Sequence, residues 1–169
     1  MEIKDLKWVN LSEANLKGAD LQGANLKGVD LKNADLLDAN LESADLRGAD
    51  LRGSNLKWVN LSEANLEGAN LTDADLQGAN LEGANLKNAD LQGAILTDAD
   101  CTDSNLRGAI FTNANLRGTN FTDANLKAAN LINANLEGAI LKGSNLSGSN
   151  LEGTILSVEW NLEGTILEK

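Results

Sequence analysis

The sequence predicts an all-β repeat protein in which short extended segments are joined by tight corners. Leucine recurs at every fifth residue from Leu6 to Leu156 in one unbroken phase, with substitutions only at Cys101, Phe111 and Phe121. The residue two positions before each member of this leucine column is usually Ala and occasionally Ser, Thr or Val, and Gly, Asn or Asp commonly stands two positions after it. A period of five fits neither an α-helix nor a simple strand, so each unit must contain a turn.

The leucine and the small residue of each unit form the predicted interior. They are two residues apart in an extended segment, so both side chains point to the same side. Aromatic residues make up only 3% of the chain, which leaves Leu and Ala to fill nearly all of the core. The remaining three positions of each unit face outward or form the corner.

The predicted corner lies two residues after each leucine. All 16 glycines occupy this position, and Asn or Asp fills most of the others. These residue types best tolerate positive φ, which the third residue of a type II turn requires. Trp8, Glu13, Trp58 and Glu63 break the pattern, and we expect another turn geometry at their corners.

Units such as Ala-Asn-Leu-Lys-Gly and Ala-Asp-Leu-Gln-Gly resemble the pentapeptide-repeat family, and the resemblance covers residues 4–158. It implies a right-handed quadrilateral parallel β-helix, a solenoid whose coils each hold four pentapeptides. The repeat region would then form about eight coils and a rod roughly 37 Å long, at about 4.8 Å per coil. Stability would come from the stacking of neighbouring coils.

Cys101 and Phe121 lie in the same column on successive coils of such a solenoid. We therefore expect the small thiol and the large ring to compensate each other in volume. We also expect Cys101 to be a buried, unreactive side chain that packs as a small hydrophobic group.

Three segments follow from the register: a lead-in at 1–3, the solenoid at 4–158 and a C-terminal cap at 159–169. The cap is predicted because the segment 157–160 holds one residue too many before the repeat resumes. We expect Trp160, with Ile166 or Leu167, to cover the last coil. Exposed strand edges at the other end invite association, and we hypothesise a weak end-to-end homodimer.

The composition argues against an enzyme. The chain has no His and a single Cys, and we find no nucleophile–base pair, phosphate-binding loop or metal-ligand spacing. We therefore predict no catalytic residue, no cofactor and no metal. Neither a signal peptide nor an apolar stretch of roughly 18 residues is present, so we expect no membrane contact and a bacterial, cytoplasmic protein.

Assigning every twentieth residue to one face separates the charges into two neighbouring ladders. The basic face, interrupted by Glu67, consists of Lys7, Lys27, Arg47, Lys87, Arg107 and Lys127. The acidic face, with Lys142 as its one basic residue, consists of Asp20, Glu42, Glu63, Glu82, Asp100, Asp103 and Asp123. Either the two ladders neutralise each other around their shared corner, or one of them binds a partner.

We predict a rigid scaffold that binds a protein partner which the sequence does not identify. The alternative comes from the resemblance: some pentapeptide-repeat proteins mimic duplex DNA and modulate DNA gyrase, a role that suits a rod with a net charge of −11. The same acidity, without interleaved aromatic residues, argues against direct binding of nucleic acid.

The outward apolar residues are predicted to be structural. Trp8 and Trp58 belong to an eleven-residue segment that occurs at 6–16 and again at 56–66, which places them on opposite faces. We expect both to pack at corners. Four isoleucines replace the Asn or Asp before a column residue, and we interpret them as local packing variants: Ile95, Ile110, Ile140 and Ile155.

Overall fold

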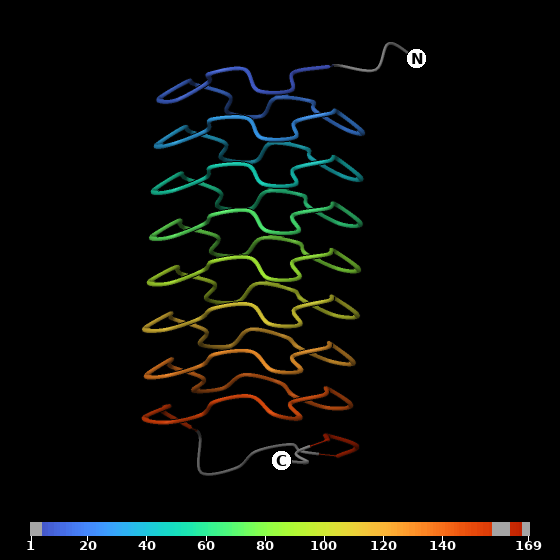
Figure 1. Cartoon of the computed structure of the whole chain (residues 1–169), viewed down its shortest axis with the longest axis vertical. Helices are drawn as coiled ribbons and strands as arrows, with labels where there is room; N and C mark the ends of the chain where they lie inside the picture. The colour runs from blue at the N-terminus through green and yellow to red at the C-terminus, as the bar shows by residue number, and fades with distance from the viewer. Residues whose placement is uncertain (1–4, 157–162, 167–169) are drawn as a thin grey trace.

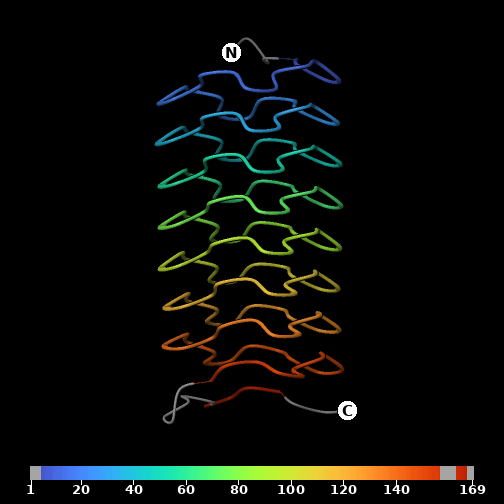
Figure 2. The same ribbon diagram turned by 90° about the vertical axis from the view of Figure 1, so that its left-hand side faces the viewer.

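The structure is a computed structural model that describes residues 5–156 and 163–166 as a single stack of coils. The chain winds steadily along the stack, so the first and last described residues lie at opposite ends (Figure 1). Corners project on both sides of this view and again after a turn of 90° (Figure 2). A corner recurs every five residues, as the positive φ values at Trp8, Glu13 and Gly18 show. Neither a helix nor a strand longer than one bridge residue occurs within the described ranges.

Isolated parallel β-bridges hold the coils together. The residue before each column residue pairs with its equivalent 20 residues on, from Asp5 with Asn25 through to Asn135 with Ile155. Four pentapeptides thus complete one coil, and each side of the rod is a column of single bridges. The parallel β-solenoid expected from the five-residue period is confirmed.

Every backbone N–H of a typical unit has a partner, as the segment 44–48 shows. Leu46 and Gly48 donate to carbonyl oxygens of the following coil at 2.7 and 3.1 Å, whereas Asp45 donates to the preceding coil at 2.9 Å. The Ala44 N–H closes the preceding turn at 3.0 Å. The fifth N–H, of Arg47, reaches the Oδ1 atom of Asp45 at 3.2 Å. The Asn or Asp before each leucine is therefore a cap for the turn that follows.

The core is a narrow column of stacked side chains. Leucines from Leu26 to Leu136 and their small neighbours are almost completely buried. The rings of Phe111 and Phe121 meet edge to face, with centroids 6.3 Å apart and planes at 78°. Cys101 is fully buried as predicted, and this burial raises the pKa of its thiol far above the ordinary range. Its volume compensation with Phe121 stays a prediction.

All the corners share one backbone feature, and one of our predictions about them is wrong. We expected another turn geometry at four corners, yet φ is 59° at Trp8, 60° at Glu13, and 57° at Trp58 and Glu63. The glycine corners have similar values, such as 63° at Gly48. Positive φ at the third residue, closed by a hydrogen bond across the turn, is the type II pattern. Stacking of the coils therefore imposes positive φ at every corner, even where the residue type does not favour it.

The register shift near the C-terminus is visible in the bridges. Asn145 pairs with Ile166, which is 21 residues on rather than 20. The backbone of Ile166 exchanges hydrogen bonds with Ser144 and Leu146 at 2.9 and 2.8 Å, so the segment 163–166 continues the stack. The predicted lead-in at 1–3 and the cap residues Trp160 and Leu167 lie outside the described residues.

Candidate functional site

The predicted acidic face follows a single column of bridges. Asp20 and Asp100 occupy bridge positions in the column that runs through Asn40, Asn60 and Asn80, and the other acidic residues lie at the corner beside it. Most of the seven carboxylates are exposed, while Glu42 and Asp100 are half-buried. No ion pair involves any of the seven within residues 5–156 and 163–166.

The predicted basic face lies beside the neighbouring column, and half of its cations are neutralised there. Lys7 and Arg47 pair with the aspartates two residues before them at 3.3 and 2.6 Å. Lys87 pairs with Glu67 of the preceding coil at 2.9 Å. For Lys27, Arg107 and Lys127, the part of the chain that the structure describes offers no ion-pair partner.

These ion pairs lie within single faces and do not join the two ladders across their shared corner. Each ion pair in the described ranges joins residues of the same face, either two residues apart or one coil apart. The physical reason is proximity, because the Asp before a leucine and the cation after it project from the same short segment. The acidic face has few cations of its own and therefore keeps its charge.

Electrostatics follow the same local pairs. The guanidinium of Arg47 donates from Nε and Nη2 to the Asp45 carboxylate at 2.8 and 2.6 Å, and this contact lowers the pKa of Asp45. Arg52 binds Asp50 in the same bidentate way and lowers the pKa of that carboxyl. Both arginines also donate backbone N–H groups to the same carboxylates. These Asp residues are thus structural as well as charged.

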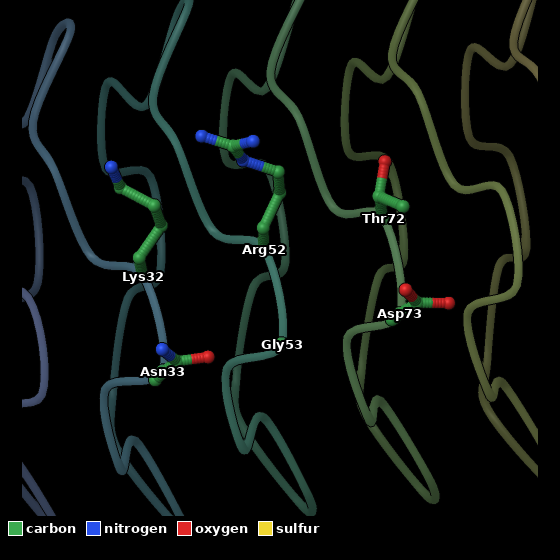
Figure 3. Close-up of a pocket in the computed structure, with 6 residues that line it drawn as sticks. All are labelled: Lys32, Asn33, Arg52, Gly53, Thr72 and Asp73. Atoms are coloured by element: carbon green, nitrogen blue, oxygen red, sulfur yellow. The ribbon is translucent and has the colours of Figure 1, made fainter.

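The structure adds a surface groove that sequence reasoning did not single out. It crosses the corners of three successive coils on a third face, and the Asn33 side chain leans over Gly53 at its centre (Figure 3). Arg52 pairs with Asp50 at 2.7 Å and Lys32 pairs with Asp30 at 3.2 Å, so the two cations beside the groove are already compensated. The groove is lined by Lys32, Asn33, Arg52, Gly53, Thr72 and Asp73. A glycine corner between two non-glycine corners at a spacing of 20 also occurs at Gly83, Gly93 and Gly108, so the sequence alone does not identify this groove.

The corner packing predicted for the two tryptophans is confirmed. The indole of Trp8 lies against Gly28, and that of Trp58 lies against Gly78, in each case one coil further on. A Cβ atom added to either glycine would overlap the ring. The outer surfaces of the rings stay open, because Trp8 is 71% exposed and Trp58 is 58% exposed.

The isoleucines occupy bridge positions on three faces, as expected. Ile95 pairs with Asp75 and Asn115, so polar residues precede and follow it in its column. An isoleucine cannot cap the next turn as Asn and Asp do. The four side chains are partly exposed and form no shared patch, which supports their interpretation as local variants.

Within residues 5–156 and 163–166, no group of three or more His, Cys, Asp or Glu side chains could hold a metal ion. The same part of the chain contains no helix long and apolar enough to cross a membrane.

Comparisons with protein-family models and with solved structures both find pentapeptide-repeat proteins. The sequence profile of pentapeptide repeats matches residues 10–48, 49–88, 84–123 and 119–157. HetL from the cyanobacterium Nostoc sp. strain PCC 7120, a pentapeptide repeat protein involved in heterocyst differentiation regulation, is 32% identical, with a TM-score of 0.55 over 98% of this chain and 92% of HetL. No curated protein gives a significant match.

Two further structures are similar. A pentapeptide repeat protein from the Arabidopsis thaliana thylakoid lumen is 33% identical, with a TM-score of 0.59 over 60% of this chain and 70% of that protein. QnrB1, a plasmid-mediated fluoroquinolone resistance protein, is 14% identical with a TM-score of 0.55, over 93% of this chain and 92% of QnrB1. At that identity the likeness to QnrB1 concerns the fold alone.

Proposed function

The chain belongs to the pentapeptide-repeat family, and from this premise we propose that it is a non-enzymatic rigid rod that binds a partner protein through its acidic face. We also infer the right-handed, quadrilateral form of the solenoid, with about eight coils at about 4.8 Å each. The likeness to HetL, a protein involved in regulation, supports a binding role.

The observation that carries the proposal is the unpaired state of the acidic face. Its seven carboxylates have no ion-pair partner among the described residues, although cations elsewhere on the rod are mostly paired. Like charges about 4 Å apart in water repel by about 1 kcal/mol before screening, so the ladder is mildly unfavourable in the free protein. A basic surface on a partner would relieve that repulsion and would be attracted over several ångströms.

A quantitative pull-down from cell lysate tests the acidic face. The variant combines Glu63→Gln, Glu82→Gln, Asp103→Asn and Asp123→Asn, none of which caps a turn. Asn tolerates the positive φ that the aspartate corners have, so the fold should persist. A control variant combines Lys27→Gln, Arg107→Gln and Lys127→Gln on the basic face. We expect specific partners to be lost from the acidic-face variant and kept by the control; equal capture by both variants would refute the proposal.

A second candidate is a DNA-mimic modulator of DNA gyrase or of another DNA-binding enzyme. The supporting observation is that unpaired carboxylates recur along one face of a straight column. Their spacing is sparse, since coils are about 4.8 Å apart whereas B-DNA carries one charge per about 1.7 Å of axis. A supercoiling assay decides this case. Inhibition or protection by the native protein that the acidic-face variant lacks supports mimicry, and no effect of either protein on gyrase removes gyrase as its target.

We also propose weak end-to-end self-association. Leu6, Leu11 and Leu16 of the first described coil are only partly buried, in contrast to the same column further along the rod. Light scattering over a range of protein concentrations measures the effect. A mass that rises with concentration supports association, and a monomer mass at the highest concentration contradicts it.

A further inference from the structure

The corner at Trp58 presents a fixed aromatic surface to solvent. The indole lies over Gly78 with one face against the backbone, and 58% of the residue is exposed. Since the glycine beneath it has no side chain, the ring is held against the rod rather than projecting freely. Such a surface is already ordered before any ligand arrives, which lowers the entropic cost of binding.

The surroundings of Trp58 are negatively charged. Within one coil on either side, its face carries three carboxylates, Asp35, Asp38 and Asp75, and one cation, Lys57. Lys57 is bound to Asp75 at 3.0 Å, which leaves two carboxylates without a cation among the described residues. Asp38 is exposed and occupies the corner directly before Trp58, about 4.8 Å away along the rod.

Trp8 provides an internal comparison, because its local sequence is a copy of that around Trp58. Its indole packs on Gly28 in the same way and is 71% exposed. The charges around Trp8 are different. On its own coil and the following one, its face carries two cations, Lys7 and Lys27, and one carboxylate, Asp5. The two rings therefore share a geometry and differ in the sign of the charge around them.

We propose that the Trp58 corner binds an arginine side chain of a partner protein. A guanidinium is planar and can stack on the open face of the indole, where the ring quadrupole attracts a cation. Asp38 supplies the compensating charge at the N-terminal side of the ring. Asp98, on the coil after Gly78, adds a further carboxylate, although its Oδ1 atom leans over Gly118 and away from the ring. This surface is separate from the acidic face.

The experiment follows the indole N–H signals of the three tryptophans by NMR while N-acetyl-arginine amide is added. N-acetyl-citrulline amide, which has nearly the same shape without the charge, is the matched neutral probe. Trp58→Phe and Trp8→Phe assign the signals. We expect a saturable shift of the Trp58 signal with the arginine probe, a much smaller shift of the Trp8 signal, and little response to citrulline.

Two corner variants test the role of charge. Asp38 and Asp103 both have a φ of 57°, so Asp38→Asn and Asp103→Asn make the same change at equivalent corners. Asp38→Asn should weaken arginine binding about threefold, as expected for one exposed charge pair, and Asp103→Asn should leave it unchanged. The proposal is overturned if the Trp58 signal does not move, if Trp8 and Trp58 respond alike, if citrulline is as effective, or if both variants weaken binding equally.

Discussion

Each corner residue has positive φ and lies directly beside the equivalent residue of the next coil, which decides which side chains a corner accepts. Gly48→Ala should lower the free energy of unfolding by about 1 kcal/mol, because φ is 63° and nothing lies within 4 Å of the new Cβ atom. Gly78→Ala should be more destabilising, because the methyl group also displaces the Trp58 ring. Denaturant unfolding gives the difference, and a red shift of tryptophan emission in Gly78→Ala alone reports the displaced ring.

The three side chains that replace leucine in the core column should share the available volume. A change at one of these positions should therefore alter the loss of stability caused by a change at another. Cys101→Leu adds atoms to a column that already holds Phe111 and Phe121, and we expect a loss of about 1–3 kcal/mol. Phe121→Leu leaves space and should lose a similar amount. The double variant should be closer to the native stability than the sum of the two losses. Additive losses in a double-mutant cycle would show that the two positions do not compensate.

The spacing of residues predicted the positions of the core and corner side chains. Residue preference, in contrast, predicted the wrong turn geometry at the tryptophan corners. The preference for Gly, Asn and Asp led us to expect an unusual turn at Trp8, whereas the stack imposes the same positive φ at every corner. The useful signal was present but longer in range: each of the two tryptophans is followed 20 residues later by a glycine. A rule based on one corner at a time cannot detect that pairing.

At the scale of the element, one side of the rod is a column of bridges reinforced by side-chain amides. Asn105 caps the Arg107 N–H at 3.3 Å and donates to Asn85 of the preceding coil at 3.1 Å. Asn115 makes the equivalent cap at 3.3 Å but follows Ile95, which cannot accept such a bond. Asn105→Ala should therefore lose about 1 kcal/mol more stability than Asn115→Ala. Thermal or denaturant unfolding of the two variants measures this; equal losses would mean that the amide ladder adds nothing.

Acid should weaken the ion pairs within a face, because their carboxylates become protonated. Arg47 lowers the pKa of Asp45 in the folded state, so the contribution of this pair is complete above the unfolded pKa of about 3.9 and is lost as the pH falls through the lowered value. The destabilisation caused by Arg47→Gln should accordingly be constant near neutrality and shrink below about pH 4. Arg107→Gln is the control, because Arg107 has no ion pair in the described ranges. A pH-independent loss in Arg47→Gln would contradict the assignment.

The two charged faces mark the limit of what element-scale sequence reasoning predicted. Assigning every twentieth residue to a face placed each charge in its correct column, because the bridges have that same offset. It did not reveal which charges are paired. Pairing depends on the orientation of side chains that lie two residues apart on one segment, such as those of Asp45 and Arg47. The five-residue period of the sequence carries no information about this orientation.

At the scale of the whole molecule, the rod is a sum of similar layers, so an entire layer should be removable. Deleting residues 25–44 joins Ala24 to Asp45 in the same phase and places Trp8 beside Gly48. We expect a folded rod about 4.8 Å shorter, with unchanged circular dichroism per residue and lower stability. Deleting residues 25–46 removes two residues more and breaks the phase, so that variant should be far less stable. Equal stability of the two deletions would refute this additive description of the stack.

The direction of the backbone hydrogen bonds gives the rod an electrical polarity. In each unit two N–H groups point toward the following coil and one toward the preceding coil, as Leu46, Gly48 and Asp45 illustrate. One peptide dipole per unit is therefore left uncancelled, and the four units of a coil add in the same direction. An α-helix has its positive pole at its N-terminal end. This solenoid has the opposite sense, so its C-terminal end is the pole that attracts anions.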